Sequence, residues 1–361
     1  METERTLKIG VVGLIRGAAV ASYAFQHKNA RITALCDVDE ARVKETQERF
    51  AEKGHVAEGF TDFDEFLKKG DFEAVIIANY ATEHVPFVVK ALEAGKHVLS
   101  EVPAVNSVEE VEILRKAVAA HPKQKYMLAE NCNYWAFVTA WKSMYRDGAL
   151  GEAIYCEAEY LHAVDYRDHA PYKDPNHWRL HNPAIKYCTH ELGPLLDILD
   201  DRCVSVSCME PEVIYNPYRP KQKNAVALFR TAKGAVIRLL IVFDAFVGFD
   251  HNYSIIGTRG SIQTDKNVSV GAEAHSFASL SSVPESRNKK IEIPISTHFS
   301  NETDEGHGGA DVKTVCAFID CVLNDTEPPI GIDLAIRMTL PGIIAAESAA
   351  QGGVLLEIPD I

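Results

Sequence analysis

The sequence predicts an α/β domain with a doubly wound parallel sheet over residues 1–130, followed by an α+β domain with a large, mainly antiparallel sheet over residues 131–361. Short apolar runs alternate with helical patterns in the first part, which is typical of a parallel sheet covered by helices on both faces. Long strand-like runs with few helices between them mark the second part. The length of 361 residues also favours two domains, since a domain averages roughly 150 residues.

Strands and helices alternate regularly through the first domain. Apolar runs predict the strands, because strands buried on both faces show little polar alternation. Ser107 is a suitable N-cap for one helix, and Gly95 is a suitable left-handed C-cap for another. The expected strands are 7–13, 32–36, 74–78 and 97–99, the expected helices are 18–27, 38–50, 86–94 and 108–120, and the pattern ends at 125–128.

The second domain begins with a helix, and two further helices precede its last strand. The turn pairs Lys233-Gly234 and Arg259-Gly260 separate strand-like runs, as expected for neighbouring antiparallel strands. The expected helices are 135–146, 311–323 and 334–350, and the expected strands are 153–162, 204–214, 225–230, 236–244, 253–256 and 354–358.

Composition excludes several classes of protein. Lys and Arg total 37 against 51 Asp and Glu, and the net charge of −14 argues against nucleic acid or an anionic membrane as a partner. No stretch approaches the roughly 18 apolar residues of a membrane span, and the charged N-terminus lacks a signal-peptide pattern. None of the eight cysteines forms a C-x-x-C pair, so we expect reduced thiols in a cytoplasmic protein.

Three glycines mark the turn between the first strand and the first helix: Gly10, Gly13 and Gly17. In a parallel α/β sheet, such a turn directs backbone N–H groups towards a pyrophosphate. Asp37 ends the second strand 20 residues after Gly17, where a carboxylate binds ribose hydroxyls and disfavours a 2′-phosphate. The pattern therefore predicts NAD as the cofactor; a doubly wound domain that binds no nucleotide is the alternative.

The glycine pattern departs from G-x-G-x-x-G. Counted from Gly13, Ile15 and Ala18 stand at the second and third glycine positions. Alanine is tolerated at the third position, whereas the second glycine normally lets the backbone approach the phosphates. Alternatively, the turn is one residue shorter, and Arg16 and Gly17 face the phosphates.

Several segments resemble the Gfo/Idh/MocA-type oxidoreductases: 98–103 (VLSEVP), 8–17, 36–42, 95–97 and the tail 338–359. The resemblance covers nearly the whole chain. It implies an N-terminal Rossmann domain and a C-terminal open-faced sheet, through which such proteins form homodimers or homotetramers. It also implies hydride transfer between a nicotinamide and a small carbohydrate or inositol.

Two family motifs are altered in this chain. The triplet Glu-Lys-Pro, whose lysine supports hydride chemistry at a hydroxyl in the family, reads Glu101-Val102-Pro103. The pair Asp-x-x-x-His has Lys186 in place of the aspartate and keeps His190. Valine exchanges no proton, and we therefore hypothesise that Lys186 supplies the ammonium group that Val102 lacks.

These departures resemble one branch of the family, the NAD-dependent α-N-acetylgalactosaminidases. Four motifs of that branch occur in order: Glu-Val-Pro at 101–103, Glu-Asn-Cys at 130–132, Thr-His-x-x-Gly-Pro at 189–194 and His-Gly-Gly-x-Asp at 307–311. The resemblance implies that NAD stays bound, that a sugar C3 hydroxyl is oxidised, and that the ketone permits elimination at C1 before NADH reduces it again. The alternatives are a net sugar or inositol dehydrogenase that releases NADH, and a non-catalytic sensor of a sugar or nucleotide.

The same resemblance, together with the turn pattern, implies the site residues. His190, Tyr160 and Lys186 are the candidate catalytic residues, although a tyrosine in a strand can equally face the core. Trp178 and Arg179 offer an aromatic plane and a five-donor fork suited to a sugar, or they pack an ordinary loop. The candidate cofactor-binding residues are Gly13, Arg16, Gly17, Asp37, Asn79, Thr82, His84, Glu101, Val102 and Asn131, and the candidate substrate-binding residues are His162, Trp178, Arg179, Tyr187 and His307.

A histidine-rich stretch precedes His190. Its composition is compatible with a divalent metal, but no tight ligand spacing such as H-x-x-x-H occurs, and we therefore expect no metal site. The stretch contains His162, Asp165, His169, His177 and His181.

Overall fold

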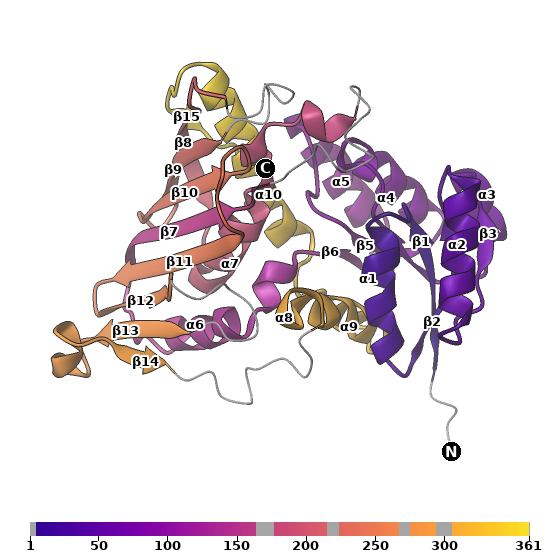
Figure 1. The fold of residues 1–361 in the computed structure, drawn as a ribbon, viewed down its shortest axis with the longest axis horizontal. Coiled ribbons are helices and arrows are strands. Elements are labelled where there is room, and N and C mark those ends of the chain that lie inside the picture. Colours follow the sequence, from indigo (N-terminus) through magenta and orange to yellow (C-terminus); the bar gives the residue numbers. More distant parts are fainter. Residues whose placement is uncertain (1–4, 164–176, 215–223, 267–274, 294–304, 361) are drawn as a thin grey trace. The chain divides into compact units, whose positions relative to one another are not determined.

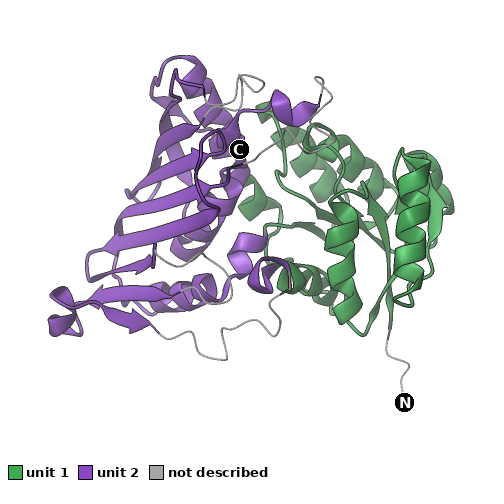
Figure 2. Cartoon of the chain, in the orientation of Figure 1, with its two compact units in different colours: residues 1–130, 311–336 green, residues 131–310, 337–361 purple. Residues whose placement is uncertain are grey.

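The computed structural model describes residues 5–163, 177–214, 224–266, 275–293 and 305–360. The chain forms two compact units (Figure 2): residues 1–130 with 311–336 make unit 1, and residues 131–310 with 337–361 make unit 2. Each unit contains one sheet and buries its own apolar side chains.

In the described part of unit 1, six strands form a parallel sheet (Figure 1). Their order is β3-β2-β1-β4-β5-β6, and every neighbouring pair is parallel, which confirms the expected doubly wound α/β fold. The strand order reverses between β1 and β4, and sheets of this kind bind ligands at the carboxyl ends of the strands at that point. The strands are β1 (Leu7–Val12), β2 (Ala30–Cys36), β3 (Glu58–Phe60), β4 (Ala74–Ile77), β5 (His97–Ser100) and β6 (Tyr126–Leu128).

Local sequence signals begin and end the helices of unit 1. Ser107 Oγ accepts a hydrogen bond from Glu110 N at 3.3 Å, as expected of an N-cap. Gly95 adopts φ +73° just after α4, as expected of a glycine that ends a helix. The helices are α1 (Gly17–Tyr23), α2 (Glu40–Ala51), α3 (Phe63–Lys69), α4 (His84–Glu93), α5 (Val108–Ala120) and α9 (Ala310–Leu323).

The segment 311–336 groups with unit 1, whereas the sequence pattern places it in the second domain. Ile330 O accepts a hydrogen bond from Leu128 N at 3.0 Å, at the end of β6. Asp325 Oδ1 lies 3.0 Å from Lys125 Nζ, directly before the same strand. These contacts join residues far apart in the chain, so local patterns could not reveal them.

A mixed sheet of nine strands forms the described core of unit 2, in the order β14-β13-β12-β11-β7-β10-β9-β8-β15. Among the described strands of this sheet, only β7 and β10 pair in parallel, so the expectation of a mainly antiparallel sheet is confirmed. The strands are β7 (Ala153–Leu161), β8 (Cys203–Met209), β9 (Ala225–Thr231), β10 (Val236–Val242), β11 (Asp250–Gly257), β12 (Gly260–Thr264), β13 (Ser276–Leu280), β14 (Ile291–Ile293) and β15 (Leu356–Glu357).

The two faces of this sheet differ in their side chains. Helices α6 (Ala136–Arg146), α7 (Thr189–Leu199) and α10 (Ile332–Ala350) cover one face (Figure 1). Buried and exposed residues alternate strictly along β9, because successive side chains of a strand point to opposite faces. Val226 and Leu228 are 42% and 50% exposed on the face away from the helices.

Several elements were not expected from local patterns. Helix α7 continues through Gly193-Pro194, a pair that is typical of a turn. Strand β12 is polar (GSIQT), and it is a strand because it pairs with β11 on one side and β13 on the other. Four further elements were missed because their three to seven residues carry too little periodicity: β3, α3, β13 and β14.

None of the described helices is long and apolar enough to cross a membrane. All eight cysteines lie among the described residues as free thiols, and all but Cys316 are buried. Burial raises the pKa of Cys36 and of Cys156 to about 12, so these thiols are protonated at neutral pH.

Candidate functional site

The turn after β1 has no room for a side chain at Gly13 and little room at Gly17. Gly13 adopts φ +80°, and a Cβ atom there would lie 2.5 Å from Ala78 O and 2.6 Å from Asn79 N. A Cβ atom on Gly17 would lie 3.2 Å from both Ala78 Cβ and Val12 O. The backbone of the turn therefore packs directly against the end of β4, as in turns that approach a pyrophosphate.

The two turn lengths left open by the sequence can now be compared. Helix α1 begins at Gly17, and Gly17 rather than Ala18 makes the close helix–strand contact expected of the third glycine. The turn is therefore one residue shorter than G-x-G-x-x-G. Ile15 is 58% exposed and Arg16 is the N-cap residue of α1.

Asp37 follows the last residue of β2 and is held by three protein donors. Its carboxylate accepts hydrogen bonds from Leu14 N at 2.7 Å, Asp39 N at 3.0 Å and Arg42 Nη1 at 2.8 Å. Asp37 is buried, whereas Arg42 is partly exposed and also pairs with Asp39 at 3.1 Å. A carboxylate has about four acceptor positions, so one remains for a ligand hydroxyl. Arg42 was not a candidate in the sequence, because a charged residue in a helix usually faces solvent.

The segment after β4 contains an amide whose hydrogen-bonding atoms have no partner. Asn79 Nδ2 and Oδ1 are both buried and have no hydrogen-bond partner within the described residues. Buried polar atoms are nearly always paired, so this amide offers a donor and an acceptor to a ligand. Thr82 is exposed in the short helix that follows.

His84 joins two loops of unit 1. Its Nδ1 lies 2.9 Å from Pro103 O, and its Nε2 lies 3.3 Å from Asn79 O. Burial lowers the pKa of His84 below its ordinary value, so the imidazole is neutral at neutral pH. The ring is 1% exposed, and the geometry therefore gives it a supporting position behind the loops.

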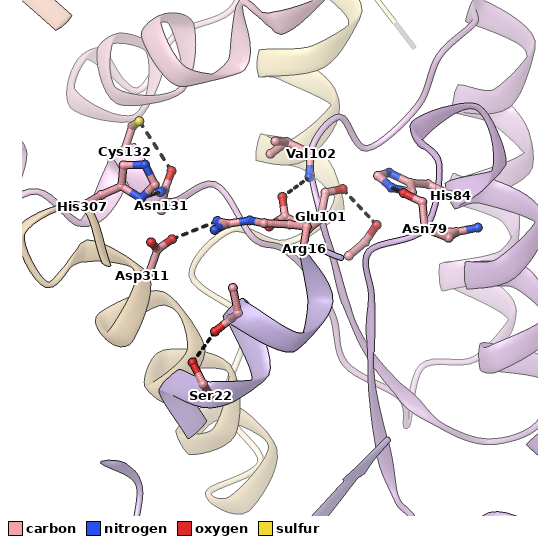
Figure 3. Close-up of polar contacts among 12 residues, drawn as sticks. Arg16, Ser22, Asn79, His84, Glu101, Val102, Asn131, Cys132, His307 and Asp311 are labelled. Carbon is pink, nitrogen blue, oxygen red and sulfur yellow. Dashed lines mark hydrogen bonds and ion pairs between the residues drawn. The ribbon is translucent and has the colours of Figure 1, made fainter. Parts of the chain in front are cut away.

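Arg16 forms ion pairs with two carboxylates from distant segments of unit 1 (Figure 3). Its Nε lies 2.8 Å from Glu101 Oε1, directly after β5, and its Nη2 lies 3.2 Å from Asp311 Oδ1, in the first turn of α9. Burial alone would lower the pKa of Arg16, but both carboxylates raise it above its ordinary value and keep the guanidinium charged. Glu101 Oε2 also accepts a hydrogen bond from Val102 N at 3.1 Å. Asp311 was overlooked as a site residue, although it closes the motif His-Gly-Gly-x-Asp.

The carboxyl edge of the unit 1 sheet fits a dinucleotide. Gly13 provides the close backbone approach, Asp37 provides a fixed carboxylate, and Asn79 provides an amide without a protein partner. These groups follow β1, β2 and β4, whose carboxyl ends meet at the point where the strand order reverses.

In unit 2, Tyr160 lies in a cluster of rings on the helix-covered face of the sheet. The Tyr160 ring stacks on His251 at 4.3 Å and 20°, and it meets His190 edge-on at 5.3 Å and 87°. Burial, and then the nearby Glu191 carboxylate, raise the pKa of Tyr160 well above 10. The phenol is therefore protonated at neutral pH, so it serves as a hydrogen-bond donor rather than a base. His162 belongs to the same cluster, 5.5 Å from Tyr160, and burial lowers its pKa.

The first turn of α7 carries His190 and Glu191. Tyr253 of β11 donates its hydroxyl to His190 O at 2.8 Å. Glu191 Oε1 lies 2.8 Å from His251 Nδ1, and both side chains are buried. Neither Glu191 nor His251 was a candidate in the sequence, since nothing local relates a helix residue to a strand 60 residues later.

Arg179 lies against two aromatic rings of unit 2. Its Cζ is 5.0 Å from the centre of the Trp178 ring and 5.3 Å from that of Tyr187. The rings of Trp178 and Tyr187 are nearly parallel, at 15° and 6.5 Å. Three of the expected substrate-binding residues are thus brought together, as a planar cation beside two aromatic faces.

Three further candidates also lie in unit 2. Asn131 and His307 lie next to each other (Figure 3), with Asn131 Nδ2 3.2 Å from His307 Nδ1. Trp135 Nε1 donates a hydrogen bond to His307 O at 3.1 Å. His307 has φ +49° and Gly308 has φ +63°. A positive φ favours glycine, which explains the glycine at position 308. Lys186 is half-buried in the short helix Ala184–Tyr187, one turn before His190. Asp165 and His169 of the histidine-rich stretch lie outside the described residues.

Three family models together match almost the whole chain. Residues 7–129 match the model described as an oxidoreductase family with an NAD-binding Rossmann fold, and residues 138–263 match the GFO/IDH/MocA C-terminal domain. The chain belongs to the Gfo/Idh/MocA oxidoreductase family. Residues 223–361 of this Gfo/Idh/MocA protein also match the C-terminal domain of glycosyl hydrolase 109. The resemblance inferred from the motifs is thereby confirmed.

Curated relatives of this Gfo/Idh/MocA protein bear glycosidase names. A glycosyl hydrolase family 109 protein of Solibacter usitatus is 28% identical, and the alignment covers 98% of this chain and 88% of the relative. An α-N-acetylgalactosaminidase of Bacteroides fragilis is 25% identical, with 98% and 91% covered.

Solved structures with the same fold include sugar and inositol dehydrogenases. Levoglucosan dehydrogenase, in complex with NADH and levoglucosan, has a TM-score of 0.82 at 19% identity and covers 99% of this chain and 100% of its own. Scyllo-inositol dehydrogenase of Lactobacillus casei, with NAD(H) and scyllo-inositol, has a TM-score of 0.78 at 19% identity, with 98% and 99% covered.

The family settles two further expectations. This Gfo/Idh/MocA protein is an NAD-dependent enzyme, of the oxidoreductase or the glycosidase type, and NAD is its cofactor.

Proposed function

We propose that the protein oxidises a ring hydroxyl of a carbohydrate, with hydride transfer to NAD, as the first step of a redox-neutral cycle that cleaves a glycoside. The observation that carries this proposal is the cluster of unit 2 in which a protonated phenol, Tyr160, meets the imidazole of His190. The names of the curated relatives support the glycosidase form of the proposal.

The proposed cofactor site uses the carboxyl edge of the unit 1 sheet. When bound there, NAD accepts a hydride from the carbon that carries the substrate hydroxyl. Asp37 would bind the ribose hydroxyls, the backbone at Gly13 and Gly17 would approach the pyrophosphate, and Asn79 would satisfy its buried amide on the cofactor. The remaining proposed contacts are Arg16, Thr82, His84 (through the loops it holds), Glu101, Val102 and Asn131.

The proposed acid–base roles follow from the protonated phenol of Tyr160 and its contact with His190. His190 accepts the proton of the substrate C3 hydroxyl as the C3 hydrogen leaves as hydride. Tyr160, which stays protonated, donates a hydrogen bond to the C3 oxygen and stabilises the carbonyl that forms. The ammonium group of Lys186 acts at the same oxygen, in the role that Val102 cannot perform.

Cleavage then needs no net oxidant. The C3 ketone acidifies the neighbouring C2–H, a base removes that proton, and the electron pair expels the C1 oxygen, which leaves as an alcohol once the protonated base returns the proton to it. Water adds across the resulting C1–C2 double bond, with hydroxide at C1 and a proton at C2. Return of the hydride and a proton to C3 restores both the hydroxyl and the cofactor.

The proposed sugar contacts lie beside the acid–base pair. Arg179 presents planar donors, and Trp178 and Tyr187 present aromatic faces that suit the C–H face of a pyranose ring. His162 and His307 complete the proposed substrate residues.

Incubation with p-nitrophenyl glycosides in deuterated water tests this proposal. Release of nitrophenol without accumulation of NADH, together with deuterium at C2 of the product sugar, is the expected result. NAD should also leave the purified protein only on denaturation. Cleavage without deuterium at C2 would contradict the elimination route.

A net dehydrogenase is the second candidate function. The structural similarity to levoglucosan and scyllo-inositol dehydrogenases favours it. NADH formed in proportion to added free sugar, with no cleavage of glycosides, would support this candidate. Tight NAD binding without turnover of any carbohydrate would instead favour a sensor.

We further propose a homodimer or homotetramer formed through the uncovered face of the unit 2 sheet. The exposed Val226 and Leu228 on that face support this assembly. Light scattering coupled to size-exclusion chromatography should give two or four chains, and Leu228→Glu should give one. The free, mostly buried thiols also support a cytoplasmic location, where thiols stay reduced.

A further inference from the structure

Unit 2 buries a carboxylate and an imidazole as a contacting pair beside Tyr160. Glu191 Oε1 and His251 Nδ1 are 2.8 Å apart, and the two side chains are 0% and 3% exposed. Removing an ionised carboxylate from water costs several kcal/mol, and its contact with a buried imidazole rarely improves stability over apolar residues. The pair therefore calls for an explanation other than stability.

The sheet register fixes the imidazole of this pair against Tyr160. His251 on β11 lies directly opposite Tyr160 on β7, and their rings stack at 4.3 Å and 20°. Tyr160 in turn meets His190 edge-on, and the rings of His190 and His251 are 6.3 Å apart. Movement of the His251 ring would therefore displace the plane of Tyr160.

The protonation state of His251 follows from its surroundings. Burial lowers its pKa well below 6.5, and the neighbouring His190, His307 and His162 lower it further, so the imidazole is neutral. A neutral imidazole beside a carboxylate carries its proton on the nitrogen that faces the oxygen. Nδ1–H of His251 therefore donates to Glu191, and this bond sets the rotation of the ring.

The same strand also holds the backbone of α7. Tyr253, two residues after His251 and on the same face of β11, donates its hydroxyl to His190 O at 2.8 Å. Glu191 follows His190 in the chain, so β11 contacts two consecutive residues of the first turn of α7. One strand thus fixes both the position of His190 and the plane of Tyr160.

We propose that Glu191 and His251 are positioning residues that orient Tyr160 and His190 for proton transfer. This inference rests on the proposed function, because it assigns proton transfer to those two rings. Glu191 and His251 need not touch the substrate; they act through the stacked ring and the first turn of α7.

Three variants and one control test the positioning role by kinetics. Glu191→Gln keeps the shape and removes the charge, His251→Phe keeps the stacked ring and removes the donor, and Tyr253→Phe removes only the hydroxyl. Each should lower kcat about 10- to 100-fold while KM changes by less than about threefold. Ser276→Ala removes a similarly buried hydrogen bond, from Trp141 Nε1, and should leave kcat unchanged.

The double variant tests whether Glu191 and His251 act as one unit. Glu191→Gln combined with His251→Phe should lower kcat no further than the worse single variant, within about twofold. Multiplicative losses, or equal losses in the Ser276→Ala control, would overturn the positioning role.

Nitrogen-15 NMR of histidine tests the inference without any substrate. His251 should show a proton on Nδ1 from about pH 5.5 to 8, and the titration midpoint of His190 should move by about 0.5 pH unit or more in Glu191→Gln and Tyr253→Phe. Unchanged titration of His190 in both variants overturns the proposal, even when the wild-type protein turns over no carbohydrate. Lack of turnover with the expected NMR result contradicts only the proposed function.

Discussion

Arg16 Nε lies 2.8 Å from Glu101 Oε1, so one guanidinium joins the turn after β1 to the segment after β5. The second arm of the same side chain reaches Asp311 at 3.2 Å and adds the first turn of α9. Three segments far apart in the sequence thus share one charge at the carboxyl edge of the unit 1 sheet. Loss of either carboxylate should therefore loosen this edge, where we propose that NAD binds.

Asp311→Asn should destabilise the protein by about 1 kcal/mol, because Asp311 is buried while Arg16 is partly exposed. The affinity for NAD should fall by roughly three- to tenfold, equivalent to about 1 kcal/mol. Urea unfolding and calorimetric titration with NAD measure the two effects. Lys69→Gln breaks the exposed pair with Glu65 and should change neither quantity measurably.

Gly13→Ala should abolish NAD binding and destabilise unit 1 by more than about 2 kcal/mol, because the added Cβ meets Ala78 O at 2.5 Å as well as an unfavourable φ of +80°. Gly54→Ala is the matched control, since Gly54 has φ +82° and no atom within 4 Å of an added Cβ. The control should cost only about 1 kcal/mol and leave NAD binding intact. Equal effects of both variants on stability and NAD binding would show that the positive φ alone causes the loss, and not the contact of the added Cβ with Ala78 O.

Asp37→Ser should weaken NAD binding about tenfold and improve the relative binding of NADP, because Arg42 then loses a carboxylate partner at 2.8 Å and can meet a 2′-phosphate. Calorimetric titration with each nucleotide gives the ratio of the two affinities. Ser107→Ala removes the N-cap of α5, away from Arg42, and should cost about 1 kcal/mol of stability without changing that ratio. An unchanged ratio in Asp37→Ser would exclude Asp37 from cofactor selection.

Two buried histidines make stability depend on pH. Burial lowers the pKa of His84 below 6.5 and that of His251 well below it, so both are neutral in the folded protein. The unfolded chain binds a proton on each below about pH 6.5, and stability is therefore complete above that pH and falls as the pH drops below it. Each histidine contributes at most about 1.4 kcal/mol per pH unit in that range.

His84→Leu should therefore flatten the dependence of the unfolding free energy on pH between 6.5 and 5. Urea unfolding at several pH values gives the slope. A variant whose curve runs parallel to that of the wild-type protein would show that His84 takes up no proton on unfolding.

Local patterns predicted the elements whose signals lie within a few residues of the chain. Strand β1 and helix α5 were expected because an apolar run and a serine N-cap act within a few residues. Strand β12 was not expected, because its polar residues form a strand only by pairing on both sides. The assignment of segment 311–336 to unit 1 was likewise not expected, since it depends on contacts between residues far apart in the sequence.

The residues of the candidate site likewise fall into those that the sequence identified and those that it did not. Gly13, Gly17 and Asp37 could be identified from the sequence, because their spacing along one strand–turn–helix segment is itself the requirement for binding a dinucleotide. Arg42, Asp311, Glu191 and His251 could not, because each acts through a side-chain contact of 3.2 Å or less that no short sequence pattern marks.

The sequence by itself determined five of the six strands of unit 1 and the helices between them except α3, the mainly antiparallel character of unit 2 and the motifs of an NAD-dependent family, since these depend on residue type and short spacing. Only the tertiary structure decided which charges pair, which ring lies on Tyr160 and which acids are protonated. Those properties depend on distance and burial, and neither is a function of separation along the chain.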